Sequence, residues 1–151
     1  MTDSETGASG LPLLERYIRR FSMADRDTRL EALLDLARRL PALPEALRDA
    51  RDREEHRVHE CQTPVFLWMV DRDGAFHLHA DVPRESPTVR GFVSLLVHTL
   101  DGAPSGAVAA MPEDLLHRLG LEETLGMMRS QGLSAIVRRV RTRAMQPPTA
   151  A

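Results

Sequence analysis

The sequence predicts an α+β fold, with a small antiparallel β-meander of about three strands packed against several α-helices. Apolar residues recur at helical spacing before residue 45 and again after residue 87. Between these regions, an apolar run and an alternating run flank Asp73-Gly74, a pair typical of a tight hairpin. Helices, a meander and further helices, in that order, indicate the α+β class.

Two helices are expected in the N-terminal third. The first runs from about Pro12, a residue suited to a first helical turn, to Phe21. The second begins near Asp27 and is stopped by Pro41 and Pro44. Their expected buried stripes are Leu13, Leu14, Tyr17, Ile18 and Phe21 in the first, and Leu30, Leu33, Leu34, Ala37 and Leu40 in the second.

The middle of the chain contains the expected strands. A charged segment from Glu45, a short helix or loop, leads to a brief edge strand around 56–58. Val65–Asp71 is apolar on both faces, which is typical of a central strand covered on each side. Ala75–Ala80 alternates, with Phe76 and Leu78 on one face and two histidines on the other.

The C-terminal half is expected to be helical after a proline-containing loop at 81–87. A long helix at 88–100 buries a stripe that comprises Val89, Phe92, Val93, Leu96 and Leu100. Shorter helices follow at 105–109, 112–119 and 122–127, and a last helix at 130–144 buries Leu133, Ile136, Val137 and Val140. We expect one domain at 11–145 between disordered tails at 1–10 and 146–151.

Composition excludes several classes of protein. A net charge of −2 and a pI near 6.3 argue against nucleic-acid binding by bulk electrostatics. No apolar run approaches the ~18 residues of a membrane span, and the N-terminus lacks the pattern of a signal peptide. A single cysteine rules out an internal disulfide and any multi-cysteine metal site. We therefore expect a cytoplasmic protein with no bound metal.

Two residue types are missing altogether. All 20 basic residues are arginine, and the chain contains no lysine and no asparagine. Without lysine, the chain can form no Schiff base with pyridoxal phosphate and has no Walker-type phosphate lysine. Without asparagine, a papain-like Cys-His-Asn set is excluded, although an aspartate can take the third place.

Cys61, the only cysteine, lies at a turn just before the apolar strand. Two interpretations fit: a small buried hydrophobic residue, or a nucleophile on a surface loop, which the polar neighbours favour. With His59, Cys61 can also form a hydrolytic pair, although no nucleophile elbow or glycine-rich loop supports it.

Two other groups of residues each have two interpretations. His77 and His79 form either half of a zinc site or an exposed polar face. The C-terminal arginines form either a solvated face or a surface for an acidic partner.

Five segments carry a resemblance to a known family. They are Arg39-Leu40-Pro41, Val58-His59-Glu60-Cys61-Gln62-Thr63-Pro64-Val65, Pro87-Thr88-Val89-Arg90-Gly91-Phe92, Leu100-Asp101-Gly102 and Arg129-Ser130-Gln131-Gly132-Leu133. In this order and spacing they resemble the SufE family of cysteine desulfuration proteins. The resemblance covers residues 11–145 and implies a fold similar to the iron–sulfur scaffold IscU.

The resemblance implies that Cys61 accepts persulfide sulfur from a cysteine desulfurase (SufS-like), stimulates it, and relays the sulfur to an iron–sulfur scaffold complex (SufBCD-like). Pyridoxal phosphate then belongs to the desulfurase, so no cofactor is expected here. In the family, the thiol loop can shelter its sulfur in an apolar pocket and extend on docking. A monomer or weak homodimer is implied.

Other functions stay open. A paralogous sulfur acceptor can serve another desulfurase and pathway. From other classes, a cysteine hydrolase using Cys61 and His59, or an interaction module with an inert Cys61, also fits the residues.

The resemblance also nominates residues around Cys61. Glu60, Gln62, Thr63, Asp81, Arg90 and Arg129 are candidates for anchoring the thiol loop or contacting the partner. Many members of the family have glycine where this chain has Glu60. A carboxylate there disfavours the thiolate unless an arginine offsets it. Pro64 further limits the freedom of the loop.

Overall fold

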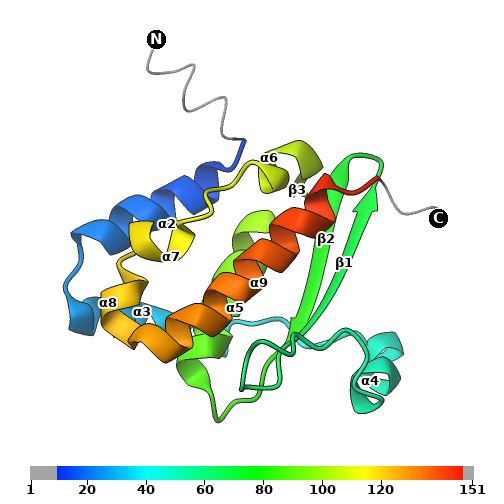
Figure 1. Cartoon of the computed structure of the whole chain (residues 1–151), viewed down its shortest axis with the longest axis horizontal. Coiled ribbons are helices and arrows are strands. Elements are labelled where there is room, and N and C mark those ends of the chain that lie inside the picture. Colours follow the sequence, from blue (N-terminus) through cyan, green and yellow to red (C-terminus); the bar gives the residue numbers. More distant parts are fainter. Residues whose placement is uncertain (1–9, 148–151) are drawn as a thin grey trace.

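The computed structural model describes residues 10–147. The predicted tails at 1–10 and 146–151 fall largely outside the described residues. The main apolar cluster of the described residues includes side chains from Leu11 to Ala144. The α+β prediction is confirmed: most of the helices lie to one side of one three-stranded antiparallel sheet (Figure 1).

The two N-terminal helices form where the apolar spacing predicts them. Helix α2 spans Pro12–Met23 and α3 spans Arg26–Arg38. Asp25 caps α3, because its Oδ1 accepts the Thr28 N–H at 2.8 Å. The predicted stripes were wrong at two positions, since Leu13 and Leu34 are exposed while Leu36 is buried.

The sheet differs from the prediction in the order of its strands. Strand β1 spans Phe66–Arg72, β2 spans Ala75–Asp81 and β3 spans Ala103–Pro104, in the order β1-β2-β3. The central strand is therefore β2, and the prediction that the first apolar run is central was wrong. The predicted edge strand at 56–58 is a single bridge between Arg57 and Phe66, and the third strand comes after the long helix instead.

A second small cluster explains why β1 is apolar on both faces. Leu67 belongs to the main core, whereas Phe66 and Trp68 pack with Leu43 in a separate cluster. Partly buried side chains of α4, Glu45–Asp52, cover that cluster. Figure 1 shows α4 at the lower right, apart from the other helices. An edge strand covered by a short helix thus has the sequence pattern of a central strand.

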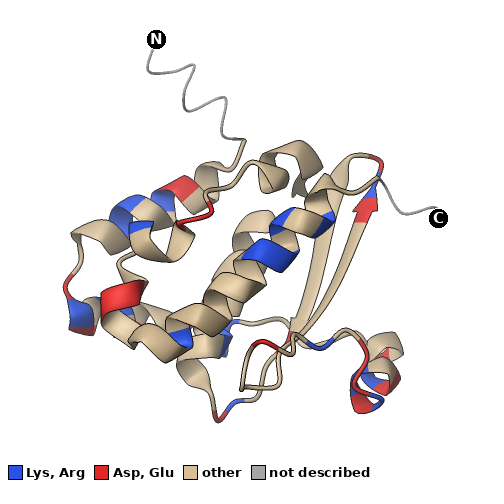
Figure 2. Ribbon diagram, viewed as in Figure 1, with Lys and Arg blue, Asp and Glu red and all other residues tan. Residues whose placement is uncertain are grey.

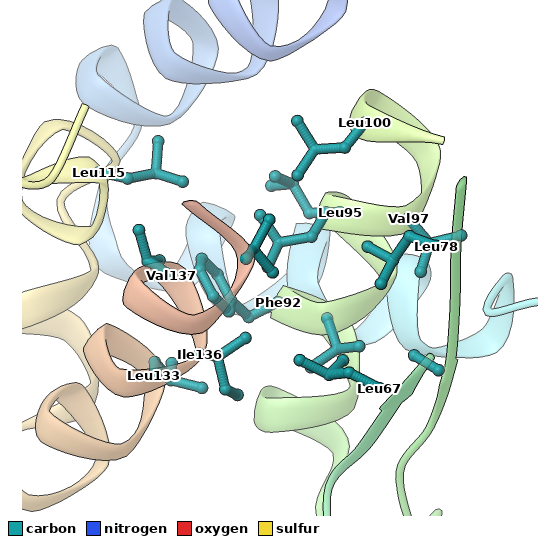
Figure 3. Close-up of a cluster of buried hydrophobic side chains, with 14 of the residues drawn as sticks. Leu67, Leu78, Phe92, Leu95, Val97, Leu100, Leu115, Leu133, Ile136 and Val137 are labelled. Atoms are coloured by element: carbon teal, nitrogen blue, oxygen red, sulfur yellow. The ribbon is translucent and has the colours of Figure 1, made fainter. Parts of the chain in front are cut away.

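Helix α5, Pro87–Leu100, lies at the centre of the fold. All five residues of its predicted stripe are buried. Figure 3 shows α5 side chains between Leu133, Ile136 and Val137 of the last helix and the leucines of β1 and β2. Its Gly91 touches α3 so closely that an added Cβ would collide with the Leu33 carbonyl oxygen. This close approach fixes α5 against α3. The residues around the start of α5 also lie beside Cys61, since they line the same cavity.

The C-terminal helices are α6 (Ser105–Ala109), α7 (Leu115–Arg118), α8 (Leu121–Leu125) and α9 (Met127–Met145). Gly126, at φ +85°, separates the last two. Helix α9 therefore begins three residues before Ser130, the predicted start. The Ser130 hydroxyl donates a hydrogen bond to the Gly126 carbonyl at 2.7 Å. The predicted buried stripe of this helix is confirmed.

Candidate functional site

Cys61 lies on a loop whose two ends are fixed in the core. The Val58 N–H donates to the Val65 carbonyl at 2.8 Å, and the Cys61 N–H donates to the Val58 carbonyl at 3.2 Å. Both valines are fully buried. We call residues 58–65 the thiol loop. Its two ends are therefore held to each other by a hydrogen bond and to the core by burial.

The thiol of Cys61 is buried, so of the two positions that the sequence left open, a buried site and a surface loop, the structure shows the buried one. Cys61 is 6% exposed and belongs to the main apolar cluster. On one side it packs against α9 at Gly132, where an added Cβ would lie 3.1 Å from Sγ. A backbone hydrogen bond from Thr63 also reaches the thiol. The sulfur is thus held between its own loop and the last helix.

A cavity of about 420 Å³ adjoins the thiol. Three segments line it: the thiol loop, the residues around the start of α5, and the start of α9. Its lining includes Glu60, Cys61, Gln62, Thr63, Ser86, Thr88, Met128, Arg129, Gln131 and Gly132. Cys61 and its neighbour Gly132 therefore both border an open space.

Burial raises the pKa of the Cys61 thiol, and this is the largest influence on it. The Thr63 hydrogen bond and the positive charge of Arg57 act in the opposite direction, while the carboxylate of Glu60 raises the pKa further. Arg57 is therefore the arginine that offsets the effect of Glu60 on the thiol pKa, but burial has a larger effect than Arg57 and keeps the pKa raised. In this position the sulfur stays a neutral thiol at neutral pH.

This raised pKa predicts a measurable pH dependence. Because folding favours the neutral thiol, its contribution to stability is present below the thiol's ordinary pKa of 9.0 and is lost as pH rises above it. Alkylation by iodoacetamide should be slow in the folded protein and should rise with pH at a higher midpoint than in the urea-unfolded chain. Equal midpoints in the two states would contradict a sheltered thiol. The thiolate absorbance in the far ultraviolet gives an independent titration.

Four of the predicted site residues lie around the cavity with Cys61. Glu60, Gln62 and Thr63 come from the thiol loop, and Arg129 from the first turn of α9. The Thr63 hydroxyl donates to Ser86 Oγ at 3.3 Å, and Arg129 Nη1 lies 3.5 Å from Thr88 Oγ1. These contacts connect the thiol loop and α9 to the residues that open α5.

Glu60 has a partner that the sequence did not reveal. Its Oε1 lies 3.8 Å from Arg139 Nη2, while Arg139 Nη1 donates to the Arg57 carbonyl at 3.2 Å. Figure 2 shows the arginines of α9 along the side of the helix. Arg139 therefore joins the thiol loop to the last helix, although its spacing had indicated only a face away from the core.

Asp81 and Arg90 lie away from the cavity. Asp81, at the end of β2, forms an ion pair with Arg51 of α4 at 3.4 Å. Arg90 donates to the carbonyls of Ala37 and Val82 at 2.9 and 2.6 Å, which joins the end of α3 to the loop before α5. Both residues hold neighbouring segments together, and neither lines the space beside Cys61.

Two exposed methionines near the thiol were missed by the sequence analysis. Met127 and Met128, at the start of α9, are 77% and 74% exposed, and Met128 lines the cavity. Exposure alone does not mark a contact site, since Met23 at the end of α2 is 88% exposed, but Met128 also lies at the cavity. The sequence signal for Met127 and Met128 was Gly126, which ends α8 and turns the following residues outward.

The structure bears on the other interpretations as well. His59 is exposed, and within residues 10–147 no histidine is hydrogen-bonded to the thiol. His77 lies 3.6 Å from Asp101, and the described part of the chain brings no three His, Cys, Asp or Glu residues together as a metal site. None of the described helices has the length and apolar character to cross a membrane.

Comparisons with known proteins agree with this architecture. The family model SufE, described as an Fe-S metabolism associated domain, matches residues 15–144. An uncharacterized SufE-like protein of Mycobacterium tuberculosis is 36% identical over 91% of this chain and 96% of its own length. The sulfur acceptor protein CsdE of Escherichia coli is 34% identical over 69% of this chain and 68% of its own length.

A solved structure has a similar fold. The solution structure of a hypothetical protein from Thermus thermophilus matches with a TM-score of 0.75 and 33% identity, over 88% of this chain and 93% of that one. The family model covers most of the chain, including the thiol loop and both helices that line the cavity. The chain therefore belongs to the SufE family.

Proposed function

We propose that this protein accepts persulfide sulfur on Cys61 from a pyridoxal-phosphate-dependent cysteine desulfurase. Membership of the SufE family supports a sulfur-acceptor role, and one relative is itself named a sulfur acceptor. The observation that carries the proposal is the position of the only cysteine. It lies on a loop with fixed ends, beside a cavity large enough to admit another protein's side chain.

The transfer is a thiol exchange. The Cys61 thiolate attacks the outer sulfur of the persulfide on the desulfurase, and a new S–S bond forms on Cys61. The S–S bond in the donor breaks at the same time, and the donor cysteine leaves as a thiolate. No external oxidant or reductant is needed, because the outer sulfur carries its oxidation state with it. This chain needs no cofactor of its own for the step.

The buried thiol must become accessible before it can react. The middle of the thiol loop can move toward the cavity while Val58 and Val65 keep its ends in the core. Movement out of the core also lowers the pKa of the thiol, since burial is the main cause of its elevation. Docking of the desulfurase thus supplies both access and a thiolate.

The rim of the cavity is the surface that we assign to the desulfurase. Met128, which lines the cavity, and the neighbouring Met127 provide exposed, adaptable apolar contacts, and Arg129 provides a charge next to them. Removing the persulfide frees the catalytic cysteine of the desulfurase for another turnover. Stimulation of the desulfurase is therefore a consequence of acceptance. In the following step, Cys61 would transfer the sulfur to an iron–sulfur scaffold in the cytoplasm.

Intact mass after incubation with an active desulfurase and L-cysteine tests this proposal. The purified protein should gain about 32 Da, and dithiothreitol should reverse the gain. Omission of the desulfurase or of L-cysteine should each abolish it. If the mass stays unchanged with a desulfurase from the same source that releases sulfide in the same tube, Cys61 is not a sulfur acceptor.

The second candidate is a paralogous acceptor that serves another desulfurase, since the relative CsdE is named a sulfur acceptor without a stated partner or pathway. Gene neighbourhood distinguishes the two: scaffold genes favour iron–sulfur assembly, and a lone desulfurase gene favours another pathway. A cysteine hydrolase that used Cys61 and His59 would show burst kinetics with activated esters. The proposed sulfur acceptor should show no such burst.

A further inference from the structure

Gly132 is a glycine in the middle of a helix, a position that glycine normally weakens. It lies within α9, Met127–Met145, and is buried. Glycine in a helix interior is destabilising relative to alanine, because it loses more backbone freedom on folding. Its φ is not positive, so the backbone does not require it. The reason for a glycine here must therefore lie in what packs against it.

The space that a side chain would take at Gly132 is filled by Cys61. The three nearest heavy atoms to an added Cβ all belong to that residue: Sγ at 3.1 Å, Cα at 3.5 Å and Cβ at 3.7 Å. The two carbon distances are ordinary van der Waals contacts. The distance to the sulfur is too short, so the sulfur would have to move.

The other helical glycines show that this arrangement is specific. An added Cβ at Gly91 meets the backbone of Leu33, whereas one at Gly106 of α6 meets nothing within 4 Å. Gly91 thus serves the contact between two helices, and Gly106 serves no contact. Among these three, it is Gly132 whose nearest atoms are all those of Cys61.

We propose that Gly132 is a positioning residue that holds the Cys61 thiol in its sheltered place. Because Gly132 has no side chain, it leaves a space on α9 that the sulfur occupies, and we call this space the seat. The size of the side chain at position 132 therefore determines how readily the thiol moves out of its buried position. This inference rests on the proposed function for its biological meaning. The seat itself is a property of this chain alone and can be measured without a desulfurase.

The direction in which a displaced sulfur moves follows from its surroundings. Val58 and Val65 fix the ends of the loop, and α9 blocks one side of the thiol. The cavity that Cys61 and Gly132 both line is the open space next to the sulfur. A side chain at position 132 therefore pushes the sulfur toward the cavity and strains its hydrogen bond from Thr63. Greater access to reagents and a lower thiol pKa follow from the same displacement.

The test measures thiol reactivity in Gly132→Ala and Gly132→Val. Gly106→Ala and Gly106→Val are matched controls, because they add the same groups at a helical position where an added Cβ meets no atom within 4 Å. We expect iodoacetamide to alkylate Gly132→Val about tenfold faster or more than the wild type, Gly132→Ala to lie between them, and the controls to be unchanged. The thiolate absorbance should titrate at a lower pH in the same order. Unchanged rates in folded Gly132 variants would overturn the proposal.

A second measurement keeps the proposal testable if Gly132→Val folds poorly. In a Cys61→Ala background the short contact with Sγ is gone, and the remaining contacts of an added Cβ are ordinary. Gly132→Ala should then raise the melting temperature, because alanine favours the helix. In the wild-type background the same substitution should raise it less or lower it. An equal shift in both backgrounds would show that the thiol does not occupy this seat.

These outcomes are separate from those of the proposed function. A protein that alkylates faster in the Gly132 series but never gains about 32 Da with a desulfurase has the seat without the sulfur transfer. A protein that accepts sulfur but shows equal reactivity across the series transfers sulfur without the seat.

Discussion

A Cys61→Ser variant is expected to lose all sulfur acceptance and some stability. No other residue of the chain is a thiol, so no persulfide can form and stimulation of the desulfurase should fall to the background level. If the side chain lay on a surface loop, this substitution would leave the fold almost untouched. The burial of Cys61 in the apolar cluster changes that expectation.

The stability loss follows from the hydroxyl group. Serine would bring a polar O–H into an apolar site, at a cost of about 1–2 kcal/mol in the free energy of unfolding. Cys61→Ala is the matched control, since it removes the thiol without adding a hydroxyl. Both variants should be inactive, and Cys61→Ser should unfold at a lower urea concentration than Cys61→Ala. Full stimulation by either variant would refute the relay through Cys61.

Gly91→Ala is expected to be the most destabilising single-methyl addition in the fold. The new Cβ meets the backbone carbonyl of Leu33, which cannot rotate away as a side chain can. Helices α3 and α5 would have to separate, and both bury residues of the main core along this contact. We expect a loss of about 3 kcal/mol in the free energy of unfolding, which corresponds to a melting temperature roughly 6–12 °C lower.

Gly106→Ala again serves as the control, because its Cβ meets no atom within 4 Å and alanine favours the helix. Its melting temperature should equal or slightly exceed that of the wild type. Because α5 opens at the thiol cavity, Gly91→Ala should also reduce sulfur acceptance near its melting temperature. A variant as stable as Gly106→Ala would show that α3 and α5 can separate at little cost.

The sequence predicted the helices with strong periodicity and failed where contacts between elements decide the outcome. Leu95 and Val97 of α5 are buried although the predicted stripe omits them, because α5 is covered on more than one side. The five residues of that stripe were predicted correctly as buried, since spacing identifies the most apolar face of a long helix. The position of β1 at the sheet edge was not, since α4 covers its outer face and gives it the composition of a central strand. The third strand is short, and its pairing with β2 depends on where α5 ends.

The same division applies to the site. The sequence by itself nominated Cys61 as the sulfur acceptor of the proposed function, because the chain has one cysteine and no lysine. It also indicated the segments around the cavity through their family resemblance. The tertiary structure decided that the thiol is buried, that Arg139 pairs with Glu60, and that Gly132 faces the sulfur. These facts depend on how α9 packs against a loop that lies far earlier in the chain, and local patterns carry no information on such a contact.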